Sequence, residues 1–273
     1  MRVSPITVLR TLATSYKLSV RSFSDRSHHE AAIADLAWKR RDLTKEFEIR
    51  LTEKKDFPIM MDLMRGFVRD DSLTQAFQTT NIDELRTLFE FLVSWQLNQL
   101  TEFKCNVIAY HKESGRPIGL RTGTVKTRNE KDDPYMVQPE REFNEKEQQI
   151  VSVIDQLSAQ FWQRHPEEKF VLQGGFFYLD PAFRGSNLAN LMISYDRDYE
   201  AYTSRGCNYW LSTSTNPRTG FTVIGRGPQS VQDHKGITRI VEYPAVLLEL
   251  DMRKFPSYNV KPHWDTMRNE NLI

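Results

Sequence analysis

Apolar and polar residues alternate in patterns that divide most of the chain into predicted strands and helices. Phe47, Ile49 and Leu51 alternate with polar neighbours, which is the two-residue period of a half-buried strand. Other short apolar runs predict strands over residues 105–110, 117–125, 171–179, 208–214, 237–241 and 245–251. The turn-forming residues between the first two of these runs predict a hairpin.

Apolar residues spaced three and four positions apart predict the helices. One begins around Pro58, which suits a first helical turn because proline has no N–H to leave unpaired, and it ends in the polar turn 69–72. Asn81, with Glu84 three residues later, is typical of a helix start. Further helices are predicted over residues 82–93, 147–163, 188–205 and 216–224.

The order of these elements predicts one mixed, three-layer α/β domain over residues 44–255. Residues 171–179 are the most apolar of the predicted strands, which predicts a central position covered on both faces. Residues 126–146 form a charged, irregular loop in this interpretation, and residues 256–273 form a polar C-terminal tail.

The composition is that of an ordinary globular protein, since 39% of the 273 residues are hydrophobic and 27% are charged. A formal charge of +1 gives no electrostatic reason to expect a nucleic acid or a membrane surface as a partner. Two cysteines form one disulfide at most, and the six histidines do not cluster at ligand spacing. We therefore expect neither a disulfide framework nor a metal site. The sequence does not indicate an oligomeric state.

The first 24 residues differ in composition from the rest of the chain. They contain no Asp or Glu, and four basic residues are spread among apolar and hydroxyl side chains. This composition is typical of a mitochondrial presequence, and Arg21-Ser22-Phe23-Ser24 is similar to a matrix-protease site cut after Phe23. We expect residues 1–23 to direct the protein to the mitochondrial matrix. The alternative is a basic N-terminus without a targeting role on a cytoplasmic protein.

The segment from Leu179 to Ala189 suggests a binding site. A predicted buried strand ends in a tight turn, and a helix opens directly with small or flexible residues. Main-chain N–H groups at such a turn, next to Arg184, suit a diphosphate, and Gly185 allows it to approach closely. The alternative is an ordinary strand–turn–helix whose Gly and Asn residues supply unusual backbone angles.

The same turn resembles a family motif. Residues 184–189, Arg-Gly-Ser-Asn-Leu-Ala, resemble the Arg/Gln-x-x-Gly-x-Gly/Ala motif of the GCN5-related N-acetyltransferase superfamily. Within it the chain looks most like the invertebrate arylalkylamine N-acetyltransferase-like branch, because residues 67–73 are similar to that branch's Phe-x-x-Asp-Glu-Pro-Leu turn. The helix at 147–163 stands where that branch has an insertion. The resemblance covers residues 44–255 and implies a central, splayed, mostly antiparallel sheet flanked by helices.

This resemblance implies that acetyl-CoA or another acyl-CoA is the co-substrate, that a small-molecule amine is the acceptor, and that no metal takes part. The pantetheine arm would pair with the main chain of Phe177 and Leu179, in a cleft between the splayed strands 171–179 and 208–214. The diphosphate would bind to the main chain of Arg184, Gly185, Ser186, Asn187, Leu188 and Ala189.

The implied reaction is attack of the amine on the thioester. An alkylamine has a pKa of about 10.4 and must first lose a proton at neutral pH. Asp71 stands where the branch has a glutamate and is the expected base, with Asp70 as the second candidate. The Leu179 N–H would stabilise the carbonyl oxygen, and Thr213 would give a proton to the departing thiolate. The alternatives are that Asp71 caps a helix and that Thr213 is a hydrogen-bonding residue at a strand end.

The sequence departs from the family pattern at several positions. Asn187 replaces the second glycine of the motif, Asp71 and Ser72 replace Glu and Pro, and Phe221 stands where many members have a tyrosine that acts as the general acid. These departures leave two other functions open. One is an acyl-CoA-binding protein that has lost activity, and the other is a protein or peptide acetyltransferase in which residues 126–146 shape a wider groove.

Overall fold

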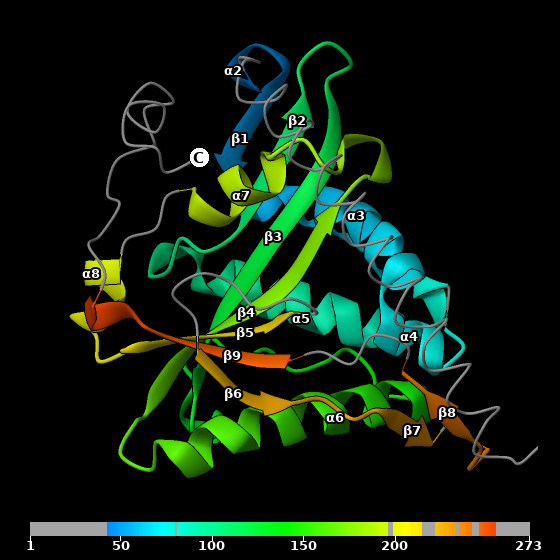
Figure 1. The fold of residues 1–273 in the computed structure, drawn as a ribbon, viewed down its shortest axis with the longest axis vertical. Helices are drawn as coiled ribbons and strands as arrows, with labels where there is room; N and C mark the ends of the chain where they lie inside the picture. The colour runs from blue at the N-terminus through cyan, green and yellow to red at the C-terminus, as the bar shows by residue number, and fades with distance from the viewer. Residues whose placement is uncertain are drawn as a thin grey trace, which may run out of the picture.

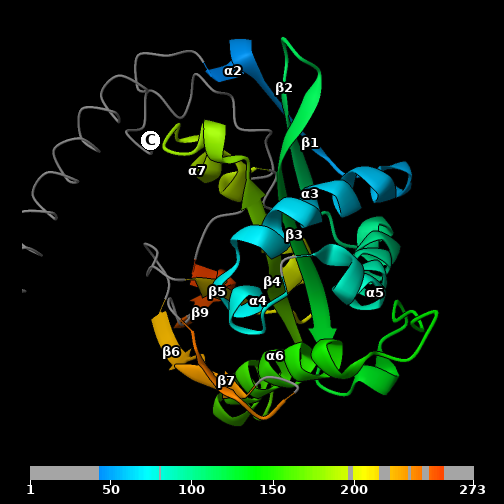
Figure 2. The ribbon, with the colours of Figure 1, turned by 90° about the vertical axis from the view of Figure 1, so that its right-hand side faces the viewer.

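The computed structural model describes residues 43–79, 81–195, 199–214, 222–232, 235–241 and 246–254. In this part of the chain a seven-stranded sheet runs through the middle of the molecule, with helices on both faces (Figure 1, Figure 2). This arrangement confirms the predicted mixed, three-layer α/β fold. The expected presequence, residues 1–23, and the expected tail, residues 256–273, lie outside the described residues.

The sheet has the strand order β1–β2–β3–β4–β5–β9–β6. Its strands are β1 (Phe47–Leu51), β2 (Val107–His111), β3 (Arg116–Thr127), β4 (Phe170–Leu179), β5 (Tyr209–Ser214), β6 (Thr222–Arg226) and β9 (Val246–Asp251). Neighbouring strands of this described sheet are antiparallel except for β4 and β5, which are parallel. β4 is the central strand, as the sequence predicted.

Helices cover the two faces of the sheet. On one face lie α3 (Phe57–Asp70), α5 (Arg86–Asn98) and α6 (Glu145–Arg164), and on the other lie α7 (Leu188–Ser194) and α8 (Tyr199–Thr203). Figure 2 shows α7 and α5 on opposite sides of the strands. Two short helices, α2 (Leu43–Glu46) and α4 (Ser72–Ala76), precede β1 and follow α3. The largest apolar cluster fills the space between the sheet and α3, α5 and α6.

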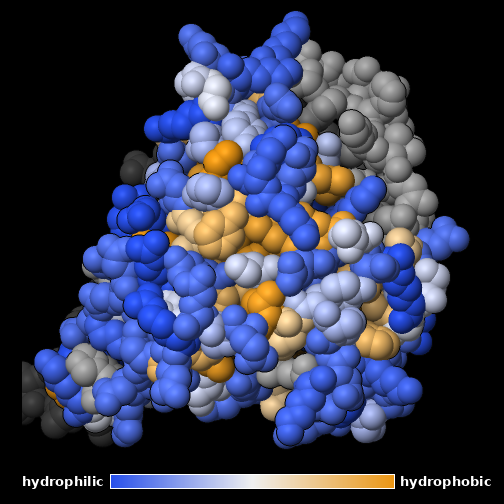
Figure 3. All heavy atoms as spheres, turned by 180° about the vertical axis from the view of Figure 1, so that it is seen from behind, coloured by the Kyte–Doolittle hydropathy of each residue, from blue (hydrophilic) through white to orange (hydrophobic). Residues whose placement is uncertain are grey.

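The molecular surface on the α3 and α5 side is mostly hydrophilic, with apolar side chains visible in a band across its middle (Figure 3). Among the described residues, the exposed large apolar side chains are Val223, Ile237 and Ile240. Ile240 ends β8 (Thr238–Ile240), which pairs with β7 (Ser230–Gln232) in a separate two-stranded sheet. The sequence predicted β8 but not β7.

Helix α3 lies close to the sheet because it contains a glycine. Pro58 stands in its first turn, as predicted. A Cβ atom at Gly66 would lie 2.2 Å from Cζ of Tyr178 on β4, so the tyrosine ring rests against the helix backbone where any other residue would put a side chain. The C-terminal half of α3 is thereby held against the C-terminal half of β4.

Two predicted helices differ from the structure. The single helix predicted from Leu188 to residue 205 is divided into α7 and α8, because Tyr195 and Tyr199 pack into two different apolar clusters and Tyr195 is extended, with a ψ of 128°. The helix predicted over 216–224 is wrong where the structure describes it, since β6 begins at Thr222 and obtains its main-chain bonds from β9. The preceding residues, Phe221 included, lie outside the described residues.

One buried carboxylate joins the starts of two helices. Glu147, which is 1% exposed, accepts the N–H of Leu88 on Oε1 at 2.9 Å, and Leu88 lies in the first turn of α5. Its Oε2 accepts the N–H of Asn144, the N-cap of α6, at 2.9 Å. Glu147 therefore supplies acceptors to N–H groups that have no partner within their own helices.

We expect Glu147→Ala to lower the free energy of unfolding by about 2–3 kcal/mol, because it leaves two helix N–H groups without an acceptor in the core. Urea denaturation measures the change. The matched control is Glu145→Ala, at the exposed first position of the same helix, which should change stability by less than about 0.5 kcal/mol. Equal losses in the two variants would contradict this role for Glu147.

Candidate functional site

The separation of β4 from β5 organises the site. The two strands pair at only two positions, Leu172 with Trp210 and Gln173 with Leu211. Beyond them β5 continues alongside β9, whereas β4 continues alongside β3 to Leu179. In Figure 1, β4 rises while β5 turns away from it. In the described sheet, the second half of β4 therefore has a strand on one edge and an opening on the other.

A β-bulge lies where the strands separate. The register of β3 and β4 places two residues, Gly175 and Phe176, opposite the single residue Thr122. The N–H of Phe176 donates to Oγ1 of Thr122 at 2.7 Å. Gly175 is exposed although it belongs to the central strand, so the prediction that this strand is covered on both faces is wrong here. A bulge bends its strand and changes the direction of its groups, and this one coincides with the opening.

The main-chain groups of Phe177 and Leu179 lie on the open edge of β4. The N–H of Asp180 donates to the carbonyl of Ile118 on β3 at 2.8 Å. Alternate residues of a strand direct their main-chain groups to opposite edges, so those of Phe177 and Leu179 point away from β3. Arg184 Nε donates to the Leu179 carbonyl at 3.0 Å, so on this residue the N–H is the group that faces the opening.

Two left-handed residues shape the predicted phosphate loop. Gly185 has a φ of 76°, and Asn187 has a φ of 55° where the family motif has glycine. A Cβ atom at Gly185 would meet nothing within 4 Å, so the loop surface is open there. Ser186 and Leu188 are buried, and Ala189 is half-buried. Because α7 has seven residues, the main-chain N–H groups of the loop, rather than a long helix dipole, are what this turn offers to an anion.

The side chain of Arg184 is directed at the end of α3. Its guanidinium forms an ion pair with the carboxylate of Asp70 in addition to its bond with Leu179. Arg69 Nε also lies 3.3 Å from Oδ1 of Asp70. The structure thus joins the predicted phosphate arginine to the second candidate base, two residues that are 114 positions apart in sequence.

Asp71 is the N-cap of α4, a helix that was not predicted. Its Oδ2 accepts the N–H of Leu73 at 3.0 Å and the N–H of Thr74 at 2.9 Å. Burial raises the pKa of Asp71 above the usual range for aspartate, while these two bonds act in the opposite direction. Asp71 does cap a helix, as the alternative interpretation held, and its raised pKa also suits a proton acceptor.

Thr213, the candidate proton donor, stands apart from the two carboxylates. It lies on β5 opposite Leu247 of β9, with an exposed side chain. Among the described residues, no hydrogen bond joins Thr213 to Asp70 or Asp71. The candidate catalytic residues therefore come from two separate elements, the end of α3 and the end of β5.

An aromatic cluster lies beside the bulge. The ring of Phe176 is 5.1 Å from that of Phe67 on α3 and 5.2 Å from that of Phe89 on α5, measured between centroids. Phe67 and Phe176 are half-buried, so they form an apolar wall next to the opening. Trp162 instead lies against the guanidinium of Arg128, 4.9 Å from the ring centroid, which makes it a packing residue.

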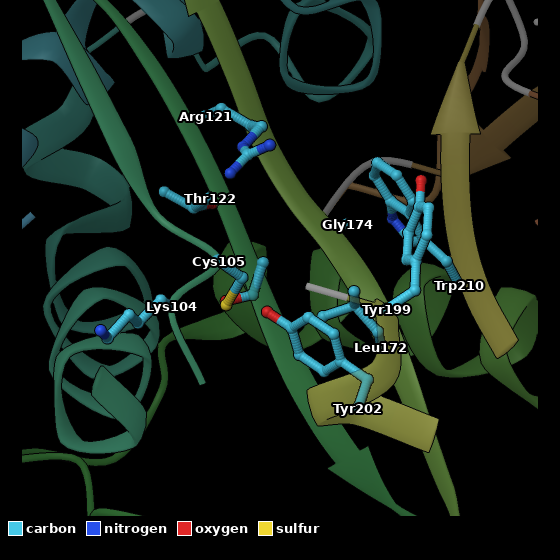
Figure 4. Close-up of a pocket in the computed structure, with 10 residues that line it drawn as sticks. Lys104, Cys105, Arg121, Thr122, Leu172, Gly174, Tyr199, Tyr202 and Trp210 are labelled. Atoms are coloured by element: carbon cyan, nitrogen blue, oxygen red, sulfur yellow. The ribbon is translucent and has the colours of Figure 1, made fainter. Parts of the chain in front are cut away.

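A small cavity of about 30 Å³ lies near the paired end of β4 and β5 (Figure 4). Thr122, Gly174 and Tyr202 are among the residues that line it. A cavity of this size holds about one water molecule, so it is too small for an acyl group. Figure 4 shows the Tyr202 hydroxyl beside Cys105, and burial raises the pKa of the Cys105 thiol to about 11. That thiol carries little thiolate at neutral pH and is not a nucleophile.

Two further features concern metals and membranes. In the part of the chain that the structure describes, no three His, Cys, Asp or Glu side chains gather where they could hold a metal ion. Within the same residues, no helix combines the length and the apolar character needed to cross a membrane.

Comparisons with known proteins identify the fold. No protein-family model matches the sequence, and no curated protein matches it. Arylalkylamine N-acetyltransferase 2 from Aedes aegypti has a similar structure, with 14% identity, a TM-score of 0.53, and coverage of 76% of this chain and 99% of that one. The mosquito arylalkylamine N-acetyltransferase-like 5b is similar at 12% identity and a TM-score of 0.53, over 74% and 98% of the two chains. The C-terminal condensation domain of Ebony, solved with β-alanyl-dopamine, is similar at 14% identity and a TM-score of 0.53, over 76% and 99%.

These similarities confirm the predicted fold, that of the GCN5-related N-acetyltransferases with an arylalkylamine N-acetyltransferase-like architecture. At such low identity they establish the fold and not the activity. The motif-based prediction found the turn and the two edge residues of β4. It missed the bulge and Thr122, although the pair Gly174-Gly175 inside the most apolar strand was a signal for one.

We expect Asp71→Asn to raise the free energy of unfolding at pH 7. The folded chain binds a proton at Asp71 more tightly than the unfolded chain, so the contribution of Asp71 to stability is largest at low pH and is lost as the pH rises through the raised pKa. Asparagine keeps an oxygen for the helix cap without the charge. The stabilisation of the variant relative to the unchanged chain should therefore shrink as the pH falls to about 4. Urea denaturation at both pH values measures it.

The control for this prediction is Asp71→Ala, which removes the cap and should lower the free energy of unfolding by about 1 kcal/mol at pH 7. A stabilisation by Asp71→Asn that is the same at pH 4 and pH 7 would show that burial of the charge is not its cause.

Proposed function

We propose that the protein is an acyl-CoA-dependent N-acyltransferase that transfers the acetyl group of acetyl-CoA to a primary amine. The observation that carries this proposal is the separation of β4 from β5 at a β-bulge, which leaves the main chain of Phe177 and Leu179 on an open edge. The similar solved structures include arylalkylamine N-acetyltransferases and a domain with bound β-alanyl-dopamine. They support an arylalkylamine as the acceptor.

Acetyl-CoA would bind along this edge and at the turn that follows it. Its pantetheine arm has amide groups that complement the open edge of β4 at Phe177 and Leu179. Its diphosphate would lie against the N–H groups of the loop, in which the two left-handed residues, Gly185 and Asn187, stand on either side of Ser186. Because Arg184 already has Asp70 as a partner, its side chain is not required as a phosphate ligand.

The chain also supplies groups for the transfer itself. Asp71 removes the proton from the ammonium form of the amine, and its raised pKa makes it a better base than an ordinary aspartate. An N–H on the open edge, from Phe177 or Leu179, stabilises the negative charge that develops on the thioester oxygen. The Thr213 hydroxyl passes a proton from water to the departing CoA thiolate, and Asp71 releases the proton taken from the amine to water.

A second candidate function is acyl-CoA binding without turnover. It is favoured by the use of both candidate carboxylates elsewhere, Asp71 as a helix cap and Asp70 in the ion pair with Arg184. The two functions share the same acyl-CoA site. They differ in whether an amine causes the release of free CoA thiol, which an assay with acetyl-CoA and a panel of arylalkylamines and polyamines measures.

We expect Gly185→Val to weaken acetyl-CoA binding about tenfold or more, a change of about 1.4 kcal/mol, because valine strains the left-handed residue at the centre of the loop. Isothermal titration calorimetry measures the affinity. The matched control is Gly115→Val in the turn between β2 and β3, where φ is 63° and the space around the residue is also open. If both variants bind acetyl-CoA as tightly as the unchanged chain, the diphosphate does not lie on this loop.

We expect Asp71→Asn to reduce kcat about 10²- to 10⁴-fold, the range for loss of a general base, while the helix cap is kept. In the unchanged chain, kcat/KM should fall as the pH falls through the pKa of Asp71, which lies above the ordinary aspartate range. Steady-state rates between pH 4 and pH 9 test this. A variant that keeps both the rate and this acidic limb would remove Asp71 from the mechanism.

A further inference from the structure

Two buried glutamines, Gln96 near the end of α5 and Gln99 directly after it, reach the same strand, β3, in different ways. Gln99, which is fully buried, uses both ends of its amide on the main chain of Val125, donating at 2.9 Å and accepting at 2.8 Å. Gln96, which is 2% exposed, donates from Nε2 to Oγ1 of Thr122 at 3.2 Å. In the described part of the chain its Oε1 has no hydrogen-bond partner. Gln99 is thus a satisfied structural residue, whereas Gln96 carries a buried acceptor without a bond.

The unpaired oxygen of Gln96 is unfavourable for stability. Leaving a buried acceptor without a hydrogen bond costs about 1–3 kcal/mol, and a leucine at this position would avoid that cost. Among the described residues, the side chain of Gln96 makes one hydrogen bond, with Thr122, the residue opposite the bulge. A polar side chain that lowers stability in the core indicates a functional role. For Gln96, the bond to Thr122 places that role at the bulge.

The hydroxyl of Thr122 links α5 to the bulge by hydrogen bonds. Its Oγ1 accepts the N–H of Phe176 at 2.7 Å as well as the amide of Gln96. The same atom would lie 2.5 Å from a Cβ atom at Gly175, and Nε2 of Gln96 would lie 2.9 Å from it. The two side chains therefore lie directly behind the exposed backbone of Gly175, and the bulge is packed against them.

We propose that Gln96 and Thr122 are positioning residues that hold the bulge of β4 so that the N–H of Phe177 faces the acyl carbonyl. This inference rests on the proposed function. The bond from Phe176 to Thr122 replaces the main-chain partner that the bulge removes, and Gln96 fixes the rotamer of that hydroxyl. Phe177 is the next residue along the chain, and its main-chain groups lie on the open edge.

The expected effect is larger on the rate than on acetyl-CoA binding. An N–H group stabilises the carbonyl oxygen most in the transition state, where that oxygen is negatively charged. Misplacing the N–H therefore mainly raises the energy of the transition state. The predicted diphosphate loop begins beyond the end of β4, several residues from the bulge, and it keeps its own geometry. Loss of the Thr122 hydroxyl should therefore lower kcat by much more than it weakens acetyl-CoA binding, because the contacts at Leu179 and at the diphosphate loop are kept.

The first test compares Thr122→Val with Thr122→Ser, using acetyl-CoA and whichever amine of the panel the unchanged chain acetylates. Thr122→Val should lower kcat by about tenfold or more, with the dissociation constant for acetyl-CoA changed by less than about twofold. Thr122→Ser keeps the hydroxyl and should restore the rate. Equal kcat values in the valine and serine variants would overturn the proposal.

The second test compares the two glutamines. Gln96→Leu should lower kcat several-fold while the free energy of unfolding stays the same or rises, because the variant removes an unpaired acceptor. Gln99→Leu removes two bonds to Val125, so it should lower the free energy of unfolding and leave kcat unchanged. A Gln96→Leu variant with an unchanged rate would show that Gln96 has no positioning role.

A third measurement does not depend on turnover. Hydrogen exchange of the Phe176 N–H, followed by NMR, should be faster in Thr122→Val than in Thr122→Ser, since the N–H loses its acceptor. Unchanged exchange would overturn the proposal even in an active enzyme. If the unchanged chain neither binds acetyl-CoA nor releases thiol, the proposed function fails, and the exchange experiment still decides whether Thr122 holds the bulge.

Discussion

The central strand of this fold is hydrogen-bonded along one edge and open along the other, and the rest of the site depends on that asymmetry. Buried main-chain N–H and C=O groups require partners, yet β5 leaves β4 after two residue pairs. Side chains take over part of the missing bonding. On the open edge, Arg184 donates to the carbonyl of Leu179, and on the β3 edge Thr122 accepts the N–H of Phe176, whose main-chain partner the bulge removes. The main-chain groups that still face the opening can be completed by a ligand that carries amides of its own.

Several polar groups around the opening serve both the fold and the proposed chemistry. Asp71 caps α4, yet its burial disfavours the charged form. Asp70 joins the end of α3 to the turn after β4 through Arg184. Gln96 supports Thr122 while its own oxygen has no hydrogen-bond partner within the described residues. Features that lower stability are expected where geometry serves a reaction, and the burial of the Asp71 carboxylate and of the Gln96 oxygen are two such features.

Local patterns predicted most of the fold because alternation and helical spacing report which face of an element is buried. They failed where the outcome depends on a distant partner. Tyr195 and Tyr199 have helical spacing but pack into separate clusters, and β6 exists because β9 provides an edge. The candidate site divides in the same way. Residues 179–189 are adjacent in sequence and were predicted as one segment, whereas the pair of Arg184 with Asp70 joins residues 114 positions apart.

The residues behind the bulge were missed for a different reason. Threonine in a strand and glutamine in a helix are ordinary choices, so Thr122 and Gln96 have no local signature. Their importance appears only when the bonds of each amide are counted, as the contrast between Gln96 and Gln99 shows. The two possible roles of Asp71 were also inseparable from sequence, since a carboxylate after a helix suits a cap and a base equally well.

The glycine at position 66 sets the spacing between the two halves of the site. With only a hydrogen atom at that position, α3 rests on the ring of Tyr178, and the helix end that carries Asp70 and Asp71 reaches the level of the turn after β4. One extra carbon there would lift the helix from the sheet, carrying both carboxylates away from the strand that would hold the thioester. In the proposed reaction, the distance between the base and the thioester would thus depend on Gly66, which contacts neither.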